Sequence, residues 1–481
     1  MTISRSGTGR HRGFRARRLV ALAITALLAG CGAGGDGGTG QLAGIEGTGI
    51  VSGFGSVYID GIEFDTDDAQ VRFNGAPATP SALRVGDVVT VAGTIDDDGR
   101  ARADRLAFDR LVDGPIERIE TRPDNTGELV ALGQTVRFDA DTRFIRSQPE
   151  ALKAGDLIAV SGLVDANDVL HASSIEHGPD YSEGRLIDIR GRIDTLTPDR
   201  FDIGALTVRY DNATIDDTAL AVGDYVQVYG RQYGTGTPLE AERITRPEQR
   251  IGNDGERVFL EGVISAVNGQ TLTLAGQTVD IGNAERIGPS QAPITSRAKI
   301  SIRGHRRGEQ IVAETISVQP APTVTLRARL TDIDAGPDRV ELLGTRWQVP
   351  ADTLYVDLAE PADRRLRLSG LRAGDTVQVN GYLDAAGLVM TRLDRVNADP
   401  VGDSMVRGPI DSIDRSDDRL TLNIAGATVV ADIGRSRFED ADGQAITASA
   451  FQAAAAGARA QATGPDNSGR IDIARTVRLL D

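Results

Sequence analysis

The chain has 481 residues and a formal net charge of −16, and 40% of its residues are hydrophobic although only 4% are aromatic. A surface this acidic repels phosphate backbones and anionic lipid headgroups, which argues against a nucleic-acid partner. The 56 glycines, many of them in Asp-Gly and Asn-Gly turns, favour short strands joined by tight hairpins, so we expect an all-β fold.

The first thirty residues predict a secretory signal peptide. Residues 5–18 carry only basic charge, and the apolar run at 19–30 is shorter than the about 20 residues that a membrane span needs. The run leads into Leu28-Ala29-Gly30-Cys31, which resembles the lipobox of bacterial lipoproteins, where the cysteine becomes the acylated N-terminus. The resemblance implies a lipid anchor on Cys31, and the uncharged Gly32 favours the outer membrane. The alternative is a buried structural cysteine.

A strand pattern then repeats along the chain. In "VGDVVTVAG" (85–93), Gly86-Asp87 precedes the alternating Val89 and Val91, and Gly93 closes the strand. The segments "AGDLIAVSG", "VGDYVQVYG" and "AGDTVQVNG" share this frame, and two worn copies at 297–304 and 457–464 bring the expected number of units to six. The period-2 alternation predicts strands with one buried face.

Each unit also contains two earlier apolar strands and a last strand after the glycine-closed one. Roughly five strands in about 70 residues suit a small closed barrel, because closure removes exposed strand edges. We therefore predict an all-β chain of six tandem OB-like β-barrels, with linkers such as "DRLVDG" and with stability approximately local to each barrel. The alternative is that neighbouring barrels dock and shorten the array. The predicted bounds are 1–30 for the signal peptide, 31–44 for the lipidated cysteine and a Gly-rich tether, and 45–110, 111–182, 183–250, 251–321, 322–400 and 401–481 for the repeats.

The first unit, "GTGIVSGFGSVYIDGIEFDT" followed by "SALRVGDVVTVAG", resembles a known family. This family consists of bacterial lipoproteins with tandem copies of the domain of unknown function 5666, and weaker resemblance covers almost all of residues 45–478. Because the family has no established activity, the resemblance implies fold and location but no catalytic residue.

The aspartate after each opening glycine is a candidate for chemistry, as a cation ligand or a base. The two worn copies have Ala298 and Ala458 instead, and Gly-Asp before a strand is a turn pair that needs no other role. We therefore predict structural turns at these aspartates, which are Asp87, Asp156, Asp224 and Asp375.

Acidic clusters and histidines are the candidate metal ligands. No cluster has the D-x-D-x-D-G spacing of the best-known calcium loop, so we predict solvated turns, with weak divalent-cation binding as the alternative. His171 and His177 are expected on the same face of one strand but about 20 Å apart, too far to share a metal. We expect no metal site and no cofactor. The clusters lie at 65–70, 96–99, 332–338 and 439–443.

Catalytic motifs are largely absent from the sequence. No nucleophilic cysteine remains once Cys31 is acylated, and "GTGIVSG" lacks the third glycine of a dinucleotide fingerprint. We therefore predict a non-catalytic, lipid-anchored envelope protein that presents its barrels to a protein or polysaccharide partner. The alternative is a glycan-binding module, since OB-like loops also bind oligosaccharides. Its stacking candidates, for which ordinary core or rim packing is the preferred explanation, are Trp347, Tyr225, Tyr229 and Tyr233.

Overall fold

The computed structural model describes residues 42–481 except 179–183, 217–218, 233, 235, 248, 335–338, 361–364 and 468. The predicted signal peptide, Cys31 and most of the predicted tether therefore lie outside the described residues. Residues 41–481 form one unit. Within the described part of the chain, no helix is both long and apolar enough to cross a membrane.

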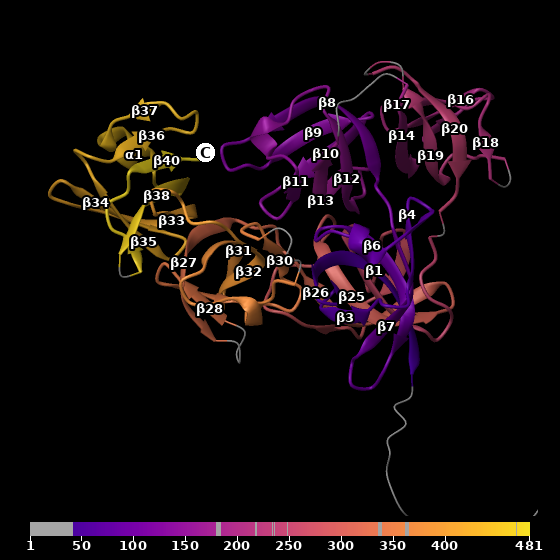
Figure 1. The fold of residues 1–481 in the computed structure, drawn as a ribbon, viewed down its shortest axis with the longest axis horizontal. Helices are drawn as coiled ribbons and strands as arrows, with labels where there is room; N and C mark the ends of the chain where they lie inside the picture. The colour runs from indigo at the N-terminus through magenta and orange to yellow at the C-terminus, as the bar shows by residue number, and fades with distance from the viewer. Residues whose placement is uncertain are drawn as a thin grey trace, which may run out of the picture. The chain divides into compact units, whose positions relative to one another are not determined.

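The first barrel shows the arrangement that the chain repeats. Strand β1 (Ala43–Phe54) pairs with β2 (Val57–Ile59), and β2 pairs with β3 (Ile62–Asp65), all antiparallel. Strand β3 runs parallel to β7 (Ala101–Phe108), which pairs with β6 (Val88–Ile95), and β6 returns to β1. The five strands thus close a ring (Figure 1), which confirms the predicted all-β, OB-like fold.

The same order recurs in five further rings, which we call barrels 2 to 6. Barrel 2 contains β8 (Val112–Thr121), β9 (Gly127–Ala131), β10 (Gln134–Phe138), β12 (Leu157–Val164) and β13 (Leu170–His177). Barrel 3 contains β14 (Leu186–Arg192), β15 (Thr195–Leu196), β16 (Arg200–Ile203), β17 (Leu206–Arg209), β19 (Tyr225–Gln232) and β20 (Leu239–Thr245). Barrel 4 contains β21 (Arg257–Asn268), β22 (Thr271–Leu274), β23 (Gln277–Asp280), β25 (Lys299–Arg307) and β26 (Gln310–Val318).

Barrels 5 and 6 complete the described chain. Barrel 5 contains β27 (Val324–Asp334), β28 (Arg339–Leu342), β29 (Thr345–Gln348), β31 (Thr376–Asp384) and β32 (Gly387–Arg395). Barrel 6 contains β33 (Asp403–Ser416), β34 (Arg419–Ile424), β35 (Ala427–Asp432), β38 (Arg459–Asn467), β39 (Arg470–Ile471) and β40 (Thr476–Leu479). Shorter elements join the strands: β4 (Gln70–Phe73), β5 (Ala76–Ala78), β11 (Arg143–Ile145), β18 (Thr214–Ile215), β24 (Glu285–Arg286), β30 (Leu354–Asp357), β36 (Arg437–Glu439), β37 (Ala445–Ile446) and α1 (Ala448–Ala454).

The two glycines of the repeated motif have different structural roles. The opening glycine has a positive φ, as at Gly86 with φ 94°, in the left-handed region that side chains disfavour. The closing glycine lies at a β-bulge, where a Cβ on Gly93 would come within 1.9 Å of the Arg102 carbonyl oxygen. In barrel 4 the opening position is Arg297, which keeps the left-handed conformation with φ 72°.

The barrels are not independent domains joined by linkers, because strands of different barrels pair with one another. Strand β1 pairs in parallel with β21, so barrels 1 and 4 share one sheet, although two other barrels lie between them in the sequence. Barrels 2 and 3 share a sheet through β8 and β14, and barrels 5 and 6 share one through β27 and β33. The predicted linker "DRLVDG" is wrong as a linker, because Val112 is buried and starts β8.

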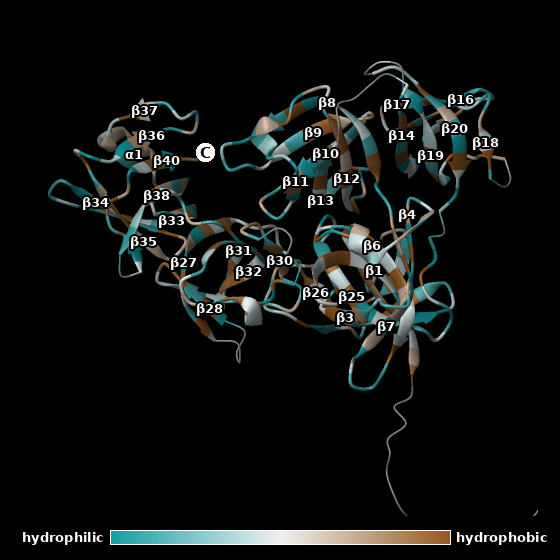
Figure 2. Cartoon of the chain, in the orientation of Figure 1, coloured by the Kyte–Doolittle hydropathy of each residue, from teal (hydrophilic) through white to brown (hydrophobic). Residues whose placement is uncertain are grey.

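Apolar side chains of the strands form the buried barrel cores. Hydrophilic residues concentrate in many of the hairpin loops (Figure 2). The core of barrel 1 contains Phe259 of barrel 4, whose ring lies 5.9 Å from that of Phe64. A Cβ on Gly47 of β1 would meet the Phe259 ring at 2.3 Å, so this glycine leaves the room that the phenyl ring occupies. Barrels 1 and 4 therefore share core residues. Docking between neighbouring barrels is the open alternative, but these two barrels are not neighbours in the chain.

Candidate functional site

The aspartates of the repeated motif close the turn before their strand. In each full copy the carboxylate accepts a hydrogen bond from the backbone amide three residues earlier. The donor–acceptor distance is 2.8 Å for Arg84 and Asp87, and 3.0 Å for Lys153 and Asp156. This geometry confirms the predicted turn role of these four aspartates, which are Asp87, Asp156, Asp224 and Asp375.

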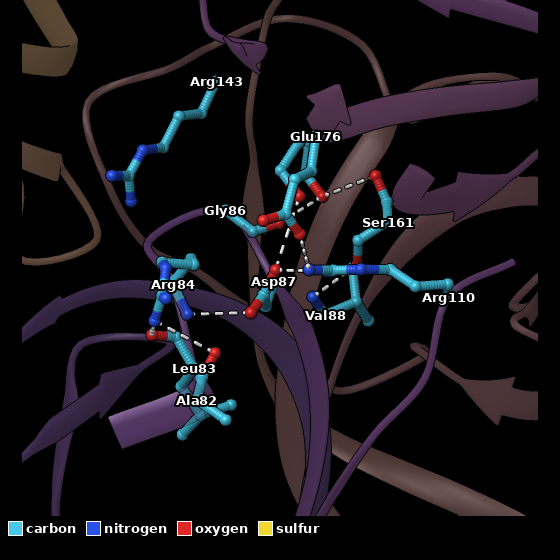
Figure 3. A network of polar contacts seen from close by, with 12 residues as sticks. Ala82, Leu83, Arg84, Gly86, Asp87, Val88, Arg110, Arg143, Ser161 and Glu176 are labelled. Carbon is cyan, nitrogen blue, oxygen red and sulfur yellow. Dashed lines mark hydrogen bonds and ion pairs between the residues drawn. The ribbon is translucent and has the colours of Figure 1, made fainter. Parts of the chain in front are cut away.

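Asp87 differs from Asp224, whose ion pair with Arg246 is partly exposed, because the ion pair of Asp87 is buried. Its side chain is 0% exposed and lies 2.6 Å from Nη1 of Arg110, which is itself buried (Figure 3). The other terminal nitrogen of Arg110 lies 3.1 Å from Oε2 of Glu176 in barrel 2. Burial acts to lower the pKa of Arg110, but the ion pairs with both carboxylates outweigh it and raise that pKa. Arg110 thus remains charged and joins barrels 1 and 2.

Hydroxyl groups complete this joint. Ser161 Oγ accepts a hydrogen bond from the Val88 amide at 2.9 Å (Figure 3). Ser173 Oγ donates to the Gly86 carbonyl oxygen at 2.5 Å. Because Ser161 and Ser173 belong to barrel 2, its polar side chains hold the motif turn of barrel 1 in place.

A second joint links barrel 3 to barrels 1 and 2. Asn74 Nδ2 donates a hydrogen bond of 2.8 Å to the buried carboxylate of Asp188, which lies opposite Asp113 in the β8–β14 pairing. Burial and the nearby Asp113 raise the pKa of Asp188 to about 7. Buried carboxylates therefore lie at the contacts between barrels as well as in the turns.

A cavity of about 810 Å³ lies where barrels 1, 2, 4 and 5 meet. Residues from all four barrels line it, including Ile50, Leu163, Glu261 and Asp352. Its volume is within the range of about 300–1,000 Å³ that small-molecule sites occupy. We take this cavity as the candidate functional site, since none of the barrels forms it alone.

Two acidic groups in the cavity wall are neutralised. Asp60 accepts from Ser301 Oγ and from Arg303 Nε, the latter at 2.7 Å, and burial raises the pKa of Asp60 to about 6 despite Arg303. Glu261 Oε1 lies 3.0 Å from Lys299 Nζ, and its Oε2 accepts from the Ile50 amide at 2.8 Å. These contacts tie barrel 4 to barrel 1.

Three other carboxylates in the lining, those of Asp139, Asp141 and Asp352, form no ion pair with a described residue. Asp141 accepts from Thr391 Oγ1 at 2.8 Å, and Asp352 accepts from Gln319 Nε2 at 2.8 Å. Burial and the adjacent Asp139 raise the pKa of Asp141 to about 7, and burial with Glu261 raises that of Asp352. The cavity therefore has more carboxylate groups than neighbouring cations can neutralise.

Of the aromatic residues proposed for glycan stacking, the three that the structure describes do not line this cavity. The prediction that Trp347 stacks on a glycan is wrong, because Trp347 is 0% exposed in the core of barrel 5. Its side chain faces the barrel interior, and its indole nitrogen donates to Thr345 Oγ1. Tyr229 is half-buried, with Arg243 4.3 Å above its ring centre. Tyr225 is also half-buried, and Arg192 lies 5.9 Å from its ring centre. Tyr233 lies outside the described residues.

The two histidines of β13 lie on opposite faces, which corrects the expectation that they share one. A bulge between β12 and β13 adds one residue between them, so the alternation shifts by one position. His171 Nε2 lies 3.1 Å from Asp165 Oδ2, and His177 Nε2 lies 3.9 Å from Asp156 Oδ2. Among the described residues, no three His, Cys, Asp or Glu side chains are grouped to hold a metal ion.

The acidic turns hold their own backbone. Asp65 accepts from the Asp67 amide, Asp96 from the Asp98 amide, and Asp440 from the Gln444 amide. The first two are the hydrogen bonds of Asx turns and the third spans four residues, so all three carboxylates bond to local turn backbone, as the solvated-turn prediction requires. The cluster at 332–338 lies partly outside the described residues.

One feature of the sequence indicates contact between barrels, although it is not part of the repeated motif. Strand β21 has neighbouring apolar residues, Val258 beside Phe259 and Val263 beside Ile264, so both of its faces are apolar. Such a strand is typical of burial on two sides. This pattern indicates that barrel 4 packs against another part of the protein.

Comparison with known proteins identifies the repeats. The family model of the "Domain of unknown function (DUF5666)" matches residues 45–107, 113–176, 190–245, 261–317 and 327–392. Barrel 6 lies outside these matches, so the predicted count of six family repeats is one too high, although its strands close in the same order.

No curated protein matches the chain. A solved structure described as "drosophila Unr CSD456" matches with 16% identity over 44% of this chain and 97% of its own, with a TM-score of 0.11. A superposition with so low a score supports no conclusion, and the absence of a nucleic-acid partner stays a prediction. The family matches cover more than half of the sequence, and the chain therefore belongs to the family of the domain of unknown function DUF5666.

Proposed function

We propose that this protein is a non-catalytic scaffold of the bacterial cell envelope, anchored by acyl chains on Cys31 and presenting docked β-barrels to a protein or polysaccharide partner. The outer membrane is its proposed location, on the periplasmic or the surface face. Membership of a family of unknown function is compatible with a structural module of this kind.

The docking of the barrels is the observation that carries the scaffold proposal. Strand pairing joins barrels 1 and 4, 2 and 3, and 5 and 6, and side-chain contacts such as Arg110–Asp87 link these pairs to one another. A scaffold must hold several binding surfaces in fixed relation, and paired sheets with buried ion pairs achieve this better than flexible linkers.

The sequence of residues 1–44 supports the anchor. A basic segment, a short apolar run and the Leu28-Ala29-Gly30-Cys31 motif are the features that lipoprotein processing requires. The Gly-rich segment after Cys31 is of the composition that forms flexible tethers.

The glycan-binding alternative has lost its strongest candidate residue, because Trp347 is enclosed in the core of barrel 5. We therefore place the polysaccharide among the partners to be tested and assign no stacking residue.

Replacing Cys31 tests the anchor. We expect the wild-type chain to be recovered in the membrane fraction with the mass of an acylated N-terminal cysteine, and Cys31→Ala to lack acyl chains and leave that fraction. Mass spectrometry of the intact protein after fractionation measures both results. An unacylated wild-type chain that begins at Met1 would contradict the proposal.

Crosslinking in living cells tests the scaffold role. With a C-terminal affinity tag on the full chain, we expect one reproducible protein or glycan partner crosslinked to a defined barrel. A purified chain that converts a substrate would refute the non-catalytic proposal. So would crosslinks no richer than those of an unrelated anchored protein.

A further inference from the structure

The cavity at the junction of barrels 1, 2, 4 and 5 has an uneven distribution of charge. Lys299 lines the cavity, is 37% exposed, and is already paired with Glu261. Asp139 and Asp141 also act on Lys299, and Asp352 lies near both Lys299 and Glu261. Lys299 is therefore shared by four carboxylates, and Arg392, which is not among the lining residues, also acts on Asp139 and Asp141.

The remaining lining cations do not correct this imbalance. Arg303 is paired with Asp60, whereas Arg297 and Arg339 are exposed and form no ion pair with a described residue. Unpaired carboxylates in a partly buried site are unfavourable unless they bind a proton or a cation.

An apolar wall stands beside the carboxylates. Ile50, Leu163 and Val263 form a small buried cluster contributed by three different barrels, and Leu354 of barrel 5 packs against it. All four residues line the cavity. The cavity thus offers an apolar surface next to excess negative charge.

We propose that this cavity binds an amphipathic organic cation, with its ammonium group among Asp141, Glu261 and Asp352 and its apolar body against Ile50, Leu163 and Val263. The inference is independent of the proposed lipid anchor.

The pH dependence follows from the same groups. Asp141 is surrounded by Asp139, Arg392 and Lys299, and burial raises its pKa to about 7. It must be ionised to pair with an ammonium group, so binding strengthens as pH rises from 5.5 to 8. Since the ionised fraction limits the apparent affinity, we expect binding about tenfold tighter at pH 8.

Calorimetric titration of the full chain with n-hexylamine tests the proposal, with hexan-1-ol and hexanoate as uncharged and anionic probes of similar size. We expect saturable binding of hexylamine alone. Asp352→Asn and Asp141→Asn should each weaken binding about tenfold, because each removes one charge and keeps the side-chain shape. The matched control is Glu309→Gln in barrel 4, whose side chain is 92% exposed and outside the cavity.

Three results would overturn the inference: equal binding of hexylamine and hexan-1-ol, preference for hexanoate, or no saturable binding of hexylamine. Circular dichroism of each variant shows whether it is folded. A loss of binding in both folded Asp variants, with Glu309→Gln unchanged, supports the assignment. None of these results depends on whether Cys31 carries acyl chains.

Discussion

At the scale of single residues, one motif position has two different environments. Asp87 is enclosed with Arg110, whereas the carboxylate of Asp224 and its partner Arg246 are 27% and 26% exposed. Local sequence predicts the turn role of both, because Gly-Asp acts within a few residues. It does not distinguish their burial, which depends on the neighbouring barrel.

Asp87→Asn should therefore destabilise the protein far more than Asp224→Asn. The first change leaves Arg110 buried without its closest partner and should cost about 3 kcal/mol, whereas the exposed pair contributes about 0–1 kcal/mol. Urea titrations, with hydrogen exchange of barrels 1 and 3 as the readout, measure the loss of unfolding free energy in each variant. Equal losses would mean that the Arg110 ion pair contributes no net stability.

The buried Asp188 should make stability fall with rising pH. Its folded-state pKa of about 7 lies above the ordinary value, so the folded protein holds a proton that the unfolded chain has released between about pH 4 and 7. Asp113, Arg190, Asp109 and Arg110 surround it.

Replacing this carboxylate isolates its contribution. Stability from Asp188 is present below about pH 4 and is lost as pH rises through about 7, so Asp188→Asn should be more stable than wild type at pH 8 by up to a few kcal/mol. At pH 4 the difference should be much smaller. Melting temperatures of both proteins across this range provide the measurement, and a constant difference would contradict the assignment.

At the scale of strands, the sequence predicts each barrel but not the packing between barrels. The period-2 alternation of apolar residues and the two motif glycines act within a few residues, and they predict the closed β-barrels. Ser301 and Gln227 alternate with buried apolar residues, so the period-2 pattern places them on the outer face of their strands, but both are buried. Ser301 is buried because it contacts Asp60 of barrel 1. Such burial depends on strands far apart in the chain, so a period within one repeat cannot predict it.

Phe259 provides the sharpest test of this packing. Phe259→Ala should cost about 3–5 kcal/mol, and the loss should appear in barrel 1, whose core the ring fills. Hydrogen exchange of β1–β7 compared with β21–β26 measures where protection falls. Phe201→Ala, in the core of barrel 3, is the control and should weaken barrel 3 and its joined partner only. Unchanged protection in barrel 1 would contradict the shared core.

At the scale of the whole molecule, the order of barrels along the chain differs from their order in the sheets. Barrel 1 joins barrel 4 through β1 and β21, and the cavity collects residues from four barrels. Truncation between barrels would therefore remove part of a sheet or of the cavity wall. The protein functions as a unit larger than its repeat, in contrast to arrays in which each repeat contacts only its sequence neighbours.

The pairing of β1 with β21 also delays the folding of barrel 1 during translation. Ile50 and Glu261, which meet across this joint, are separated by 211 positions, so ribosomes that add about 5–20 residues per second need roughly 10–40 s to produce the second after the first. Throughout that interval the space beside Gly47 lacks the Phe259 ring, and the backbone groups of β1 that pair with β21 have no partner strand. Such an exposed strand edge can pair with other chains. The core of barrel 1 is complete only after Phe259 has been synthesised. A chaperone that covers the β1 edge would therefore bind barrel 1 before the other barrels.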